Sequence, residues 1–404
     1  MIDSLKEKQR RLIFSIKDID YTRKEFSFIN SKERLIALIG ARGVGKTTLL
    51  LQYIKQYSMD DALYFSADDM SIVNFGIYEI VEVFYKLGGR TVIIDEVHKF
   101  KDWAGHVKNI YDFFPDLTIR ISGSSMLNIL MQSHDLSRRI LIKELHKLSF
   151  KEYFEMRNGV SLASYSLEEV LDGHIDITYE LTQTYPTLYK QFTDYLKMGC
   201  YPFFLSSQDQ DSYNNKLFNA IEKIIYEDIP STNKIKFDSL SIFKKLMYKL
   251  VVAKVPYKVV IDSLAKDLGI SEPTLYVYLD ILNKTGIFKS IKKFSKKESR
   301  KPEKLFFSNT NILYALSSDQ KIQTEIGTVR ETYFVNSLPD VYYSDIGDFK
   351  VNDYIFEVGS KNKTFKQIKE IDNGYLALDI DTSTNKRKIP LWIFGLIADK
   401  GTIK

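Results

Sequence analysis

The sequence predicts an open α/β domain with a parallel sheet, followed by a helical region, a helix-turn-helix and a second α/β region. Two observations predict the first domain. Short apolar runs alternate with longer amphipathic runs between residues 35 and about 145, and a glycine-rich loop follows the first apolar run. This alternation is typical of βαβ units, in which helices join parallel strands. With 404 residues, the chain is long enough for about two or three separate cores.

Four apolar runs are expected to form strands of the first sheet, with helices between them. The strands are 35–39, 62–65, 91–94 and 117–121, and the helices are 46–57, 72–87 and 103–114. Open α/β sheets bind ligands at the carboxyl ends of their strands, so we expect a functional site at that edge.

A phosphate-binding loop is predicted directly after the first strand, where the pattern Gly-x4-Gly-Lys-Thr opens the next helix. Its glycines let the backbone curl, so that N–H groups and the helix N-terminus point at phosphates. The Lys46 ammonium would reach the β- and γ-phosphates, and the Thr47 hydroxyl would ligate Mg²⁺. We therefore expect ATP and Mg²⁺ as ligands. The residues expected at this site are Gly40, Ala41, Arg42, Gly43, Val44, Gly45, Lys46, Thr47 and Thr48.

An acidic pair follows the strand 91–94. Asp95 is expected to hold Mg²⁺ and Glu96 to act as the general base that polarises the attacking water. The alternative is that the pair only caps the next helix. Because a general base has no purpose in a site that merely holds nucleotide, the pair favours ATP hydrolysis. His98 follows the pair, and a single histidine more often bonds a backbone carbonyl than performs chemistry.

Serine and arginine residues further along the chain are candidates for the hydrolytic step. Ser122, at the end of the strand 117–121, could orient the water or sense the γ-phosphate, and Ser124 and Ser125 offer the same hydroxyl group. Ordinary turn chemistry explains these serines equally well. Arg138 and Arg139 could supply a guanidinium to the transferring phosphoryl group, in cis or from a neighbouring subunit. Surface ion pairing is the alternative for both.

At this point the chain resembles a family of prokaryotic AAA-like ATPases of the additional-strand class, whose P-loop domain precedes a C-terminal domain of unknown function. The resemblance rests on segments 40–48, 93–99, 121–125, 144–153, 195–202 and 301–307. It implies an ATPase core, a winged helix and a C-terminal module similar to restriction endonucleases. The substrate of such proteins is left open by the resemblance.

A winged helix-turn-helix is also predicted from the residues themselves. Helices are expected at 239–253, 259–268 and 272–284, followed by β-like runs at 287–294 and 304–307 around a polar loop. Ser271 is a candidate N-cap, and Pro273 lies in the first turn, where its missing N–H costs little.

Basic residues are concentrated on the expected wing. Residues 284–304 contain nine Lys or Arg and two acids, Glu298 and Glu303. Such a surface is suited to phosphates, and Thr274, Tyr276 and Tyr278 of the preceding helix could meet a DNA backbone or base edge. The alternative is a scaffold that joins the nucleotide site to a partner. The candidate DNA contacts are Lys289, Lys292, Lys293, Lys296 and Lys297.

The C-terminal region contains part of a nuclease pattern. A restriction-type core needs an Asp on one strand and Glu-x-Lys on the next, where the acids hold Mg²⁺ and the lysine positions water. Asp348 and Glu357 are present, but Gly359 stands at the lysine position. Lys361 could substitute only if the strand end turned back. We therefore expect a nuclease-like fold that has lost cleavage.

Composition excludes several other classes of protein. A single cysteine, Cys200, rules out an intrachain disulfide, and the five scattered histidines cannot build a Cys/His zinc site. Since no apolar stretch approaches the roughly 20 residues of a membrane span, we expect a cytoplasmic protein without a membrane partner. The net charge of +5 is mild for this length.

These predictions give four expected regions and three alternative functions. The regions are the ATPase domain with an N-terminal extension (1–146), a helical region (147–232), the winged helix (233–308) and the nuclease-like domain (309–404). The first function is an ATP-hydrolysing switch coupled to DNA through the winged helix. The alternatives are a regulatory ATPase that acts on a protein partner, and an ATP-gated nuclease. A homo-oligomer is compatible with all three.

Overall fold

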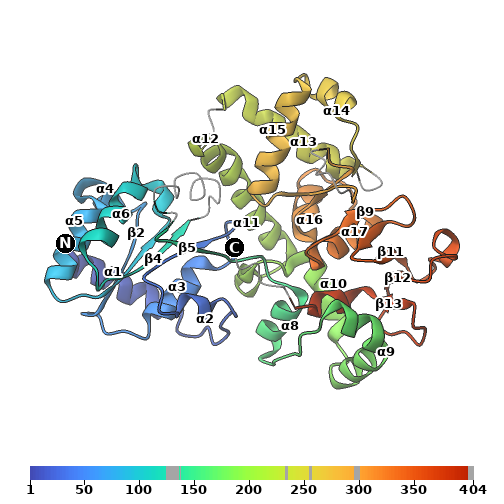
Figure 1. Cartoon of the computed structure of the whole chain (residues 1–404), viewed down its shortest axis with the longest axis horizontal. Helices are drawn as coiled ribbons and strands as arrows, with labels where there is room; N and C mark the ends of the chain where they lie inside the picture. Colours follow the sequence, from blue (N-terminus) through green and yellow to red (C-terminus); the bar gives the residue numbers. More distant parts are fainter. Residues whose placement is uncertain (124–135, 137, 233–234, 254–256, 295–300, 399–404) are drawn as a thin grey trace. The chain divides into compact units, whose positions relative to one another are not determined.

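The computed structural model describes residues 1–123, 136, 138–232, 235–253, 257–294 and 301–398 (Figure 1). Two compact units are present, residues 1–147 and 148–403. Their boundary lies beside the expected domain boundary at 146, whereas the expected boundaries at 232 and 308 fall inside the second unit.

The first unit is built on a parallel five-stranded sheet in the order β2-β3-β4-β1-β5. Its strands are β1 Leu35–Ile39, β2 Ala62–Ser66, β3 Thr91–Asp95, β4 Thr118–Gly123 and β5 Leu141–Glu144. Because β4 lies between β1 and β3, the sheet has the topology of the additional-strand class. The predicted α/β P-loop domain is thereby confirmed.

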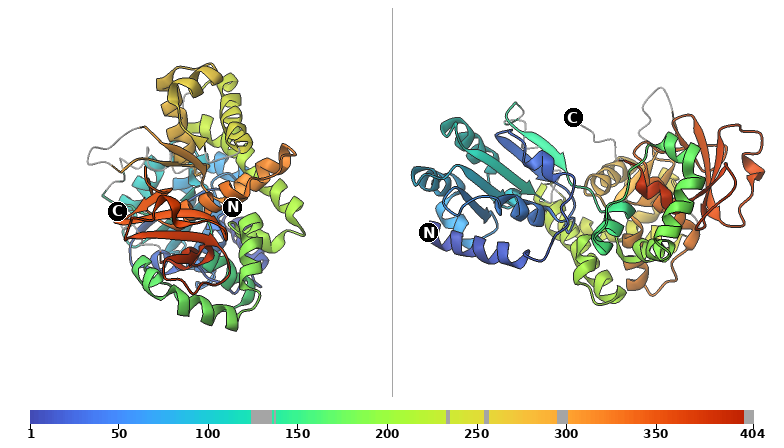
Figure 2. Two further views of the ribbon diagram at one scale, coloured as in Figure 1. Left: turned by 90° about the vertical axis from the view of Figure 1, so that its right-hand side faces the viewer. Right: turned by 90° about the horizontal axis from the view of Figure 1, so that it is seen from below.

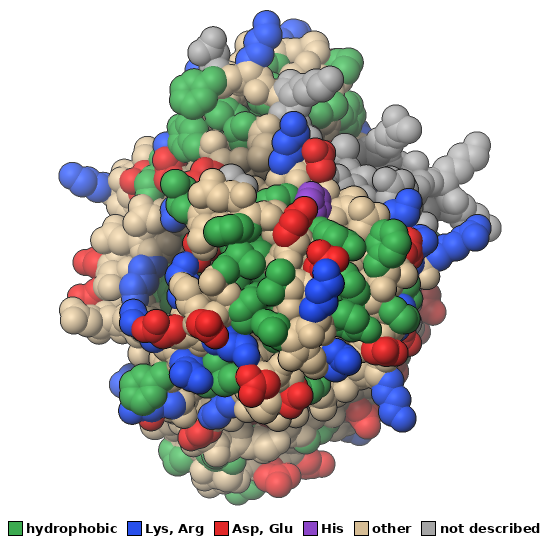
Figure 3. Space-filling view, turned by 90° about the vertical axis from the view of Figure 1, so that its left-hand side faces the viewer, with side chains coloured by type: hydrophobic (Ala, Val, Ile, Leu, Met, Phe, Trp, Pro, Cys, Tyr) green, Lys and Arg blue, Asp and Glu red, His purple; other side chains and the backbone are tan. Residues whose placement is uncertain are grey.

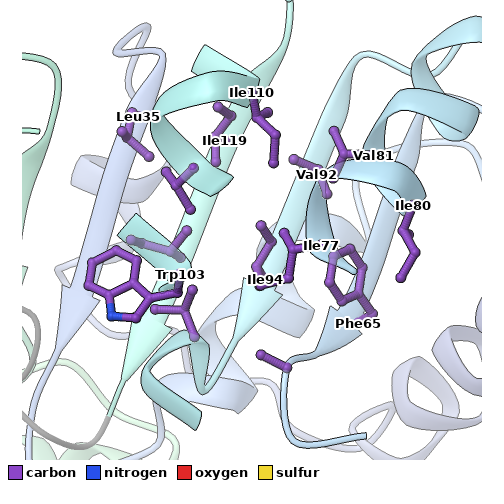
Figure 4. Packing of buried hydrophobic residues seen from close by; sticks show 14 of the residues in the cluster. Leu35, Phe65, Ile77, Ile80, Val81, Val92, Ile94, Trp103, Ile110 and Ile119 are labelled. Carbon is purple, nitrogen blue, oxygen red and sulfur yellow. The ribbon is translucent and has the colours of Figure 1, made fainter. Parts of the chain in front are cut away.

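Helices cover both faces of this sheet (Figure 2). They are α1 Ile2–Ser15, α2 Phe26–Ile29, α3 Lys46–Ile54, α4 Met70–Phe75, α5 Ile77–Lys86 and α6 Trp103–Phe113. Alternate strand residues such as Leu35, Val92 and Ile119 point at α5 and α6, where Ile80 and Ile110 meet them (Figure 4). This buried layer fixes the face of each strand and thus the direction of the polar residues at the strand ends.

The expected helix 72–87 is wrong in one respect, because it is two helices. Gly76 separates α4 from α5 with φ of +84°, a left-handed region that side-chain-bearing residues rarely adopt. A Cβ at this position would lie 2.1 Å from a carboxylate oxygen of Glu79. The periodic apolar pattern continues across the break and therefore conceals it.

Helix α1 closes one edge of the sheet. It contacts the edge strand β2 and also α3 and α5. The buried Gln9 accepts a hydrogen bond from the Tyr64 N–H at 2.9 Å and donates one to the Ala62 carbonyl at 3.2 Å. One side chain therefore satisfies a donor and an acceptor that an edge strand otherwise leaves open.

A buried arginine anchors the segment before β1. The Arg120 guanidinium donates to the carbonyls of Ile29, Ser31 and Glu33 at 2.8 to 3.0 Å, and it lies over the Tyr53 ring. Burial lowers the pKa of Arg120. These bonds tie the turn after α2 to the middle of the sheet.

The second unit begins with helices. They are α8 Phe150–Asn158, α9 Leu167–Thr184, α10 Leu188–Met198, α11 Gln210–Lys223 and α12 Ile229–Thr232, with a π-helical turn at Ile224–Asp228. Both α8 and α9 begin with a capping box, in which Ser149 pairs with Glu152 and Ser166 with Glu169.

A three-stranded antiparallel sheet follows, in the order β6-β8-β7. The elements are α13 Leu240–Val252, β6 Tyr257–Lys258, α14 Ile261–Leu268, α15 Glu272–Lys284, β7 Phe288–Ile291 and β8 Lys304–Phe307. The bounds of α15 agree with the predicted 272–284, and Ser271 caps this helix by accepting the Thr274 N–H. The assignment of this region as a winged helix-turn-helix stays a prediction.

The last sheet is mixed, in the order β13-β12-β11-β10-β9, with antiparallel pairs among β9, β10 and β11 and parallel pairs among β11, β12 and β13. Its elements are α16 Thr310–Asp319, α17 Ile326–Ser337, β9 Tyr342–Tyr343, β10 Phe349–Val351, β11 Tyr354–Ser360, β12 Gly374–Asp379 and β13 Lys388–Pro390. The apolar run 390–397 is mostly the 3-10 helix Leu391–Leu396. Within the described ranges, no helix is both long and apolar enough to span a membrane.

Candidate nucleotide-binding site

The loop between β1 and α3 has a backbone that requires glycine at both ends. Gly45 precedes α3 with φ of +99°, in the left-handed region. A Cβ on Gly40 would lie 2.4 Å from the carbonyl oxygen of Leu145, so the loop could not pass this close to the end of β5. The loop therefore turns sharply after β1, and its N–H groups lie beside the N-terminus of α3.

Lys46 begins α3 and folds back over this loop. Its buried ammonium donates to the carbonyls of Gly40 at 2.8 Å and Ala41 at 3.0 Å. Phosphate oxygens are charged acceptors and bind an ammonium more strongly than neutral carbonyls do. The ammonium is thus positioned to exchange these carbonyls for the phosphates of a nucleotide.

Asp95, at the end of β3, is the centre of the site. One carboxylate oxygen accepts the Thr47 hydroxyl at 2.6 Å and the Tyr64 hydroxyl at 2.7 Å. The other accepts the Ser122 hydroxyl and the Glu96 N–H. Burial, followed by the charge of Asp95, raises the pKa of Tyr64, so the phenol stays protonated and donates. These four donors fix the carboxylate beside the phosphate loop.

Glu96 adopts a left-handed backbone, with φ of +49°. Such a conformation costs roughly 1 kcal/mol or more for a residue with a side chain. The Glu96 N–H is held by Asp95 at 3.1 Å and Ser122 at 3.2 Å, which offsets that cost. The Nε2 atom of His98 lies 3.5 Å from the Glu96 carboxylate. Only about a quarter of the Glu96 side chain is exposed.

The residues fit a magnesium ion that accompanies a nucleotide. The Thr47 hydroxyl and the Asp95 carboxylate are already within hydrogen-bonding distance, so both can belong to the shell of one cation. Mg²⁺ prefers such oxygen ligands, keeps several waters and takes the rest from phosphates. Thr47 would bind the ion directly and Asp95 through water.

Most of the predicted residues meet at one edge of the sheet. The loop 40–45, Lys46, Thr47, Asp95 and Ser122 all lie where β1, β3 and β4 end. Ser122 is buried and its hydroxyl donates to Asp95, so it acts on the carboxylate in this structure. Ser124 and Ser125 lie outside the described residues. Catalytic roles for these groups, and for Arg42 and Thr48, stay predictions.

The two candidate arginines lie at the other edge. β5 runs parallel to β1 and its first residue, Leu141, pairs with Ile36, so residues 138 and 139 precede β5 at the amino edge of the sheet. The Arg139 guanidinium forms a two-pronged ion pair with Asp112 of α6, at 2.9 and 3.1 Å. Neither Arg138 nor Arg139 is therefore brought to the phosphate loop of its own chain. A role in a neighbouring subunit stays a prediction.

The sequence motifs did not include two polar residues that support the site, Tyr64 and Arg23. Tyr64 shares a sheet face with Asp95, and strand alternation across the paired β2 and β3 is the signal that could have revealed it. Arg23 is buried and donates to the carbonyls of His146 at 2.7 Å and Val44 at 3.3 Å, so it supports the loop from behind. No motif contains Arg23, and nothing in the sequence predicts its contacts.

Two family models match the chain. Residues 32–154 match an AAA domain, and residues 189–323 match a domain of unknown function, DUF8612. Two proteins of Methanocaldococcus jannaschii, both named as uncharacterized, are similar over most of the chain. One is 30% identical over 306 residues, covering 71% of this chain and 63% of the relative. The other is 22% identical over 280 residues, covering 68% and 59%. The chain thus spans about three fifths of the length of these relatives.

Two solved structures of other proteins are also similar to the chain. AMPPCP-bound DnaA from Aquifex aeolicus is 14% identical, with 65% of this chain and 85% of that chain covered and a TM-score of 0.27. A DNA polymerase III gamma-subunit-related protein from Thermotoga maritima is 13% identical, with 65% and 96% covered and a TM-score of 0.26. At such TM-scores neither likeness bears on function.

Proposed function

We propose that this protein binds ATP with Mg²⁺ at residues 40–48 and hydrolyses it, since residues 32–154 match an AAA domain. One observation carries the proposal: Thr47, Asp95 and Glu96 are linked by hydrogen bonds at the end of the strands that hold the phosphate loop. A phosphate loop, a metal-binding carboxylate and a neighbouring base are the parts that phosphoryl transfer to water requires.

Each residue has a distinct task in the proposed reaction. The loop N–H groups and Lys46 would hold the β- and γ-phosphates, and Thr47 and Asp95 would hold Mg²⁺, which would neutralise charge on the phosphate oxygens. Glu96 accepts a proton from the attacking water as its oxygen bonds to the γ-phosphorus. The bond between that phosphorus and the β–γ bridging oxygen breaks, and ADP and phosphate leave.

The test is steady-state ATP hydrolysis by the wild type, Glu96→Gln and Lys46→Ala. Glu96→Gln should bind ATP and hydrolyse it about 10²- to 10⁴-fold more slowly, because the base is lost. Lys46→Ala should lose binding. Glu33→Gln, an exposed glutamate of the same unit, is the matched control and should behave as wild type. Equal rates for Glu96→Gln and Glu33→Gln would exclude Glu96 as the base.

The proposed switch couples this cycle to DNA through the wing. The order of strands β6-β8-β7 and the basic run 284–304 support it. The wing supplies fewer free charges than the sequence suggested, however. The Lys289 ammonium donates to the carbonyls of Val335 and Leu338, and Lys293 is ion-paired with Asp345. Lys292 is half-buried on the wing, and Lys296 and Lys297 lie outside the described residues.

The side chains of helix α15 are poorly suited to contact DNA in this structure. Tyr278, proposed as a DNA contact, is buried against Phe243 with ring centroids 4.6 Å apart, so that prediction is wrong. The exposed side chains of the helix include Glu272, Val277, Asp280 and Lys284, and the positive charge of Lys284 is ion-paired with Asp280. DNA contact would therefore come from the wing, whose basic side chains would bind the phosphates of the DNA backbone and would not contact base edges.

DNA coupling is tested by the same ATPase assay at low salt, with and without double-stranded DNA. Acceleration that Glu96→Gln abolishes would support the switch. Lys292→Glu should weaken DNA binding, measured by fluorescence anisotropy, whereas Lys190→Glu on an exposed position of α10 should not. Absence of DNA binding at low salt would exclude the switch while leaving ATP hydrolysis intact.

A regulatory ATPase that acts on a protein partner is the second candidate. Apolar side chains are exposed on α4 and α6 and directly after α5, among them Met70 at 83% and Leu87 and Phe113 at 67%. Figure 3 looks onto the first unit, where apolar side chains lie between charged ones of both signs. In the second unit, Val277 lines a hollow of about 440 Å³ beside α15. Retention of a stoichiometric protein partner that accelerates ATP hydrolysis, with DNA having no effect, would favour this candidate.

A further inference from the structure

The two units are joined by a short connector, residues 146–147. The first unit ends at residue 147, and the second begins at residue 148. On the near side, the buried Leu145 donates its N–H to the Ile39 carbonyl at 2.8 Å, so the end of β5 is tied to β1. On the far side, the Leu148 N–H donates to the Cys200 carbonyl at 2.9 Å. The connector therefore runs between two anchored positions.

The far end is held by two polar side chains of the second unit. The Tyr195 hydroxyl donates to the Leu148 carbonyl at 2.8 Å, and burial raises the pKa of Tyr195, so the phenol stays protonated. The buried Asn311 accepts the Cys200 N–H at 2.7 Å, which fixes the residue to which Leu148 donates. Two of the segments that carry the family resemblance meet in these contacts, namely 144–153 and 195–202.

A buried guanidinium joins the connector to the phosphate loop. The Nη1 atom of Arg23 donates to the His146 carbonyl at 2.7 Å and to the Val44 carbonyl at 3.3 Å. Since Val44 belongs to the phosphate loop and His146 to the connector, one nitrogen atom bridges the two. Only 7% of the Arg23 side chain is exposed, and the Glu25 carboxylate lies 3.7 Å from its Nε. A charged donor of this kind bonds carbonyls more strongly than a neutral donor does.

The peptide unit between Val44 and Gly45 links this bridge to phosphate binding. In a planar trans peptide, the C=O group and the following N–H group point in opposite directions. Because the Val44 carbonyl points at Arg23, the Gly45 N–H points away from it. The N–H groups of this loop are the donors expected to bind phosphates. A phosphate that fixes the Gly45 N–H would therefore also fix the carbonyl that Arg23 binds.

The start of the loop contacts the near end of the connector as well. A Cβ on Gly40 would lie 2.4 Å from the Leu145 carbonyl oxygen, so the two backbones touch. The Lys46 ammonium bonds the Gly40 carbonyl at 2.8 Å and would exchange it for phosphate. Both contacts between the loop and residues 145–146 therefore depend on the conformation of the loop.

We infer that nucleotide binding at residues 40–48 orders the connector, and that Arg23 carries this effect from the loop to the His146 carbonyl. The inference rests on the proposed nucleotide binding and names the residue that couples this site to the backbone entering the second unit. Coupling between two sites is reciprocal, so an ordered connector in turn favours nucleotide binding. Arg23 acts through Val44 and is thus a positioning residue.

Amide hydrogen exchange of the full chain tests the coupling, with and without a non-hydrolysable ATP analogue and Mg²⁺. The Lys147 N–H belongs to the same peptide unit as the His146 carbonyl, so its exchange reports on the bond to Arg23. Exchange at Lys147 should slow about threefold or more when the analogue binds. Helix α9, which packs on α10 and β13, should exchange at the same rate in both states. Trypsin should also cleave more slowly after Lys147, measured by the appearance of a fragment that begins at Leu148.

A matched pair of variants tests Arg23. The double variant Arg23→Met, Glu25→Gln removes both donors and leaves no buried carboxylate without its partner. It should bind a labelled analogue through Lys46 and the loop N–H groups, measured by fluorescence anisotropy, while exchange at Lys147 no longer responds. Glu25→Gln alone keeps the guanidinium and should show the wild-type slowing. Arg23→Lys keeps the charge beside Glu25 on a shorter side chain and should show reduced slowing, so the test does not depend on the folding of the double variant.

The outcomes separate the coupling from nucleotide binding itself. Binding of the analogue by wild type without slower exchange at Lys147 would overturn the inference and leave the nucleotide site standing. The wild-type slowing in the double variant or in Arg23→Lys would exclude Arg23 as the coupling residue, because a purely structural side chain leaves the response to nucleotide unchanged. Lys46→Ala should lose both binding and slowing. Absence of binding by wild type would contradict the proposed function and this inference together.

Discussion

At the scale of single residues, the Asp95 carboxylate links the parts of the nucleotide site by accepting hydrogen bonds from four groups. The motifs supplied Thr47, Asp95 and Glu96 because their chemistry depends on sequence spacing along one strand and one loop. They could not supply Tyr64 or Arg23, which reach the site from other elements through contacts that only the folded sheet creates. For the same reason only Lys361 was considered as a possible substitute near Glu357, whereas the turn after β11, which no pattern encodes, brings the Lys363 ammonium to 3.0 Å from that carboxylate.

Tyr64→Phe should weaken the use of Mg²⁺. The change removes the 2.7 Å hydrogen bond to Asp95 and leaves Thr47 as the only hydroxyl on that carboxylate oxygen. We expect the half-saturating Mg²⁺ concentration for ATP hydrolysis to rise about three- to tenfold, with a stability loss of about 1 kcal/mol. Tyr57→Phe, which removes a bond to Tyr53, is the control. An unchanged Mg²⁺ titration would exclude Tyr64 as a positioning residue.

Asp69 should give the first unit a small acid-sensitive contribution to stability. The hydrogen bond from Lys8 lowers the pKa of Asp69 to about 2, with help from Ser71. The native carboxylate therefore stabilises the fold above its ordinary pKa near 4, and this contribution is lost as the pH falls toward 2. Asp69→Asn keeps the helix cap and should cost about 0.5 kcal/mol at pH 7, because half of Lys8 is exposed to solvent.

Denaturant unfolding at pH 7, 4 and 3 measures this effect. The difference between wild type and Asp69→Asn should shrink between pH 4 and 3. A difference that is the same at all three values would mean that the ionised form of Asp69 contributes nothing.

At the scale of elements, strong patterns were predicted well and weak ones were not. The strands β1 to β4 and the helices α3, α6 and α15 were predicted close to their observed bounds. Each strand is an apolar run and each helix has apolar residues at helical spacing, and the first residue of each pattern is clear in the sequence. β5, β6, β10 and β12 were not predicted as strands. They are short, flanked by polar residues or dependent on their neighbours in the sheet, and such strands form through pairing that local sequence does not reveal.

Gln9→Leu should destabilise the first unit more than its position in an N-terminal helix suggests. The substitution leaves the Tyr64 N–H and the Ala62 carbonyl of β2 without partners in a buried place. We expect a loss of about 2–4 kcal/mol in thermal or denaturant unfolding. Gln56→Leu, at an exposed glutamine two residues after α3, should change stability by less than about 0.5 kcal/mol. Equal stability losses for Gln9→Leu and Gln56→Leu would mean that water replaces the hydrogen bonds of Gln9 with no loss of stability.

At the scale of the whole molecule, the two candidate arginines, Arg138 and Arg139, lie away from the phosphate loop of their own chain. Arg138 is exposed and Arg139 is held by Asp112 at the opposite edge of the sheet. If a second copy supplies Arg138, the ATPase rate per chain should rise with protein concentration, and Arg138→Ala should lower it about tenfold or more.

A mixing experiment separates the two copies. Arg138→Ala keeps its own Glu96, and Glu96→Gln keeps its own Arg138, so a mixture of the two inactive variants should regain part of the rate. Activity that is independent of concentration, together with no recovery on mixing, would mean that Arg138 has no role in a neighbouring site.

The bonds made by α1 and Arg120 also determine how the ATPase domain can be isolated. A fragment that began at residue 32, where the AAA match starts, would lack Gln9 and the carbonyls of Ile29 and Ser31. Its outer strand would present unpaired amides to other chains, and a buried guanidinium would lose two of its acceptors. Such a fragment should precipitate or assemble into mixed sheets, so cloning boundaries must follow the hydrogen bonds and include residues 2–31.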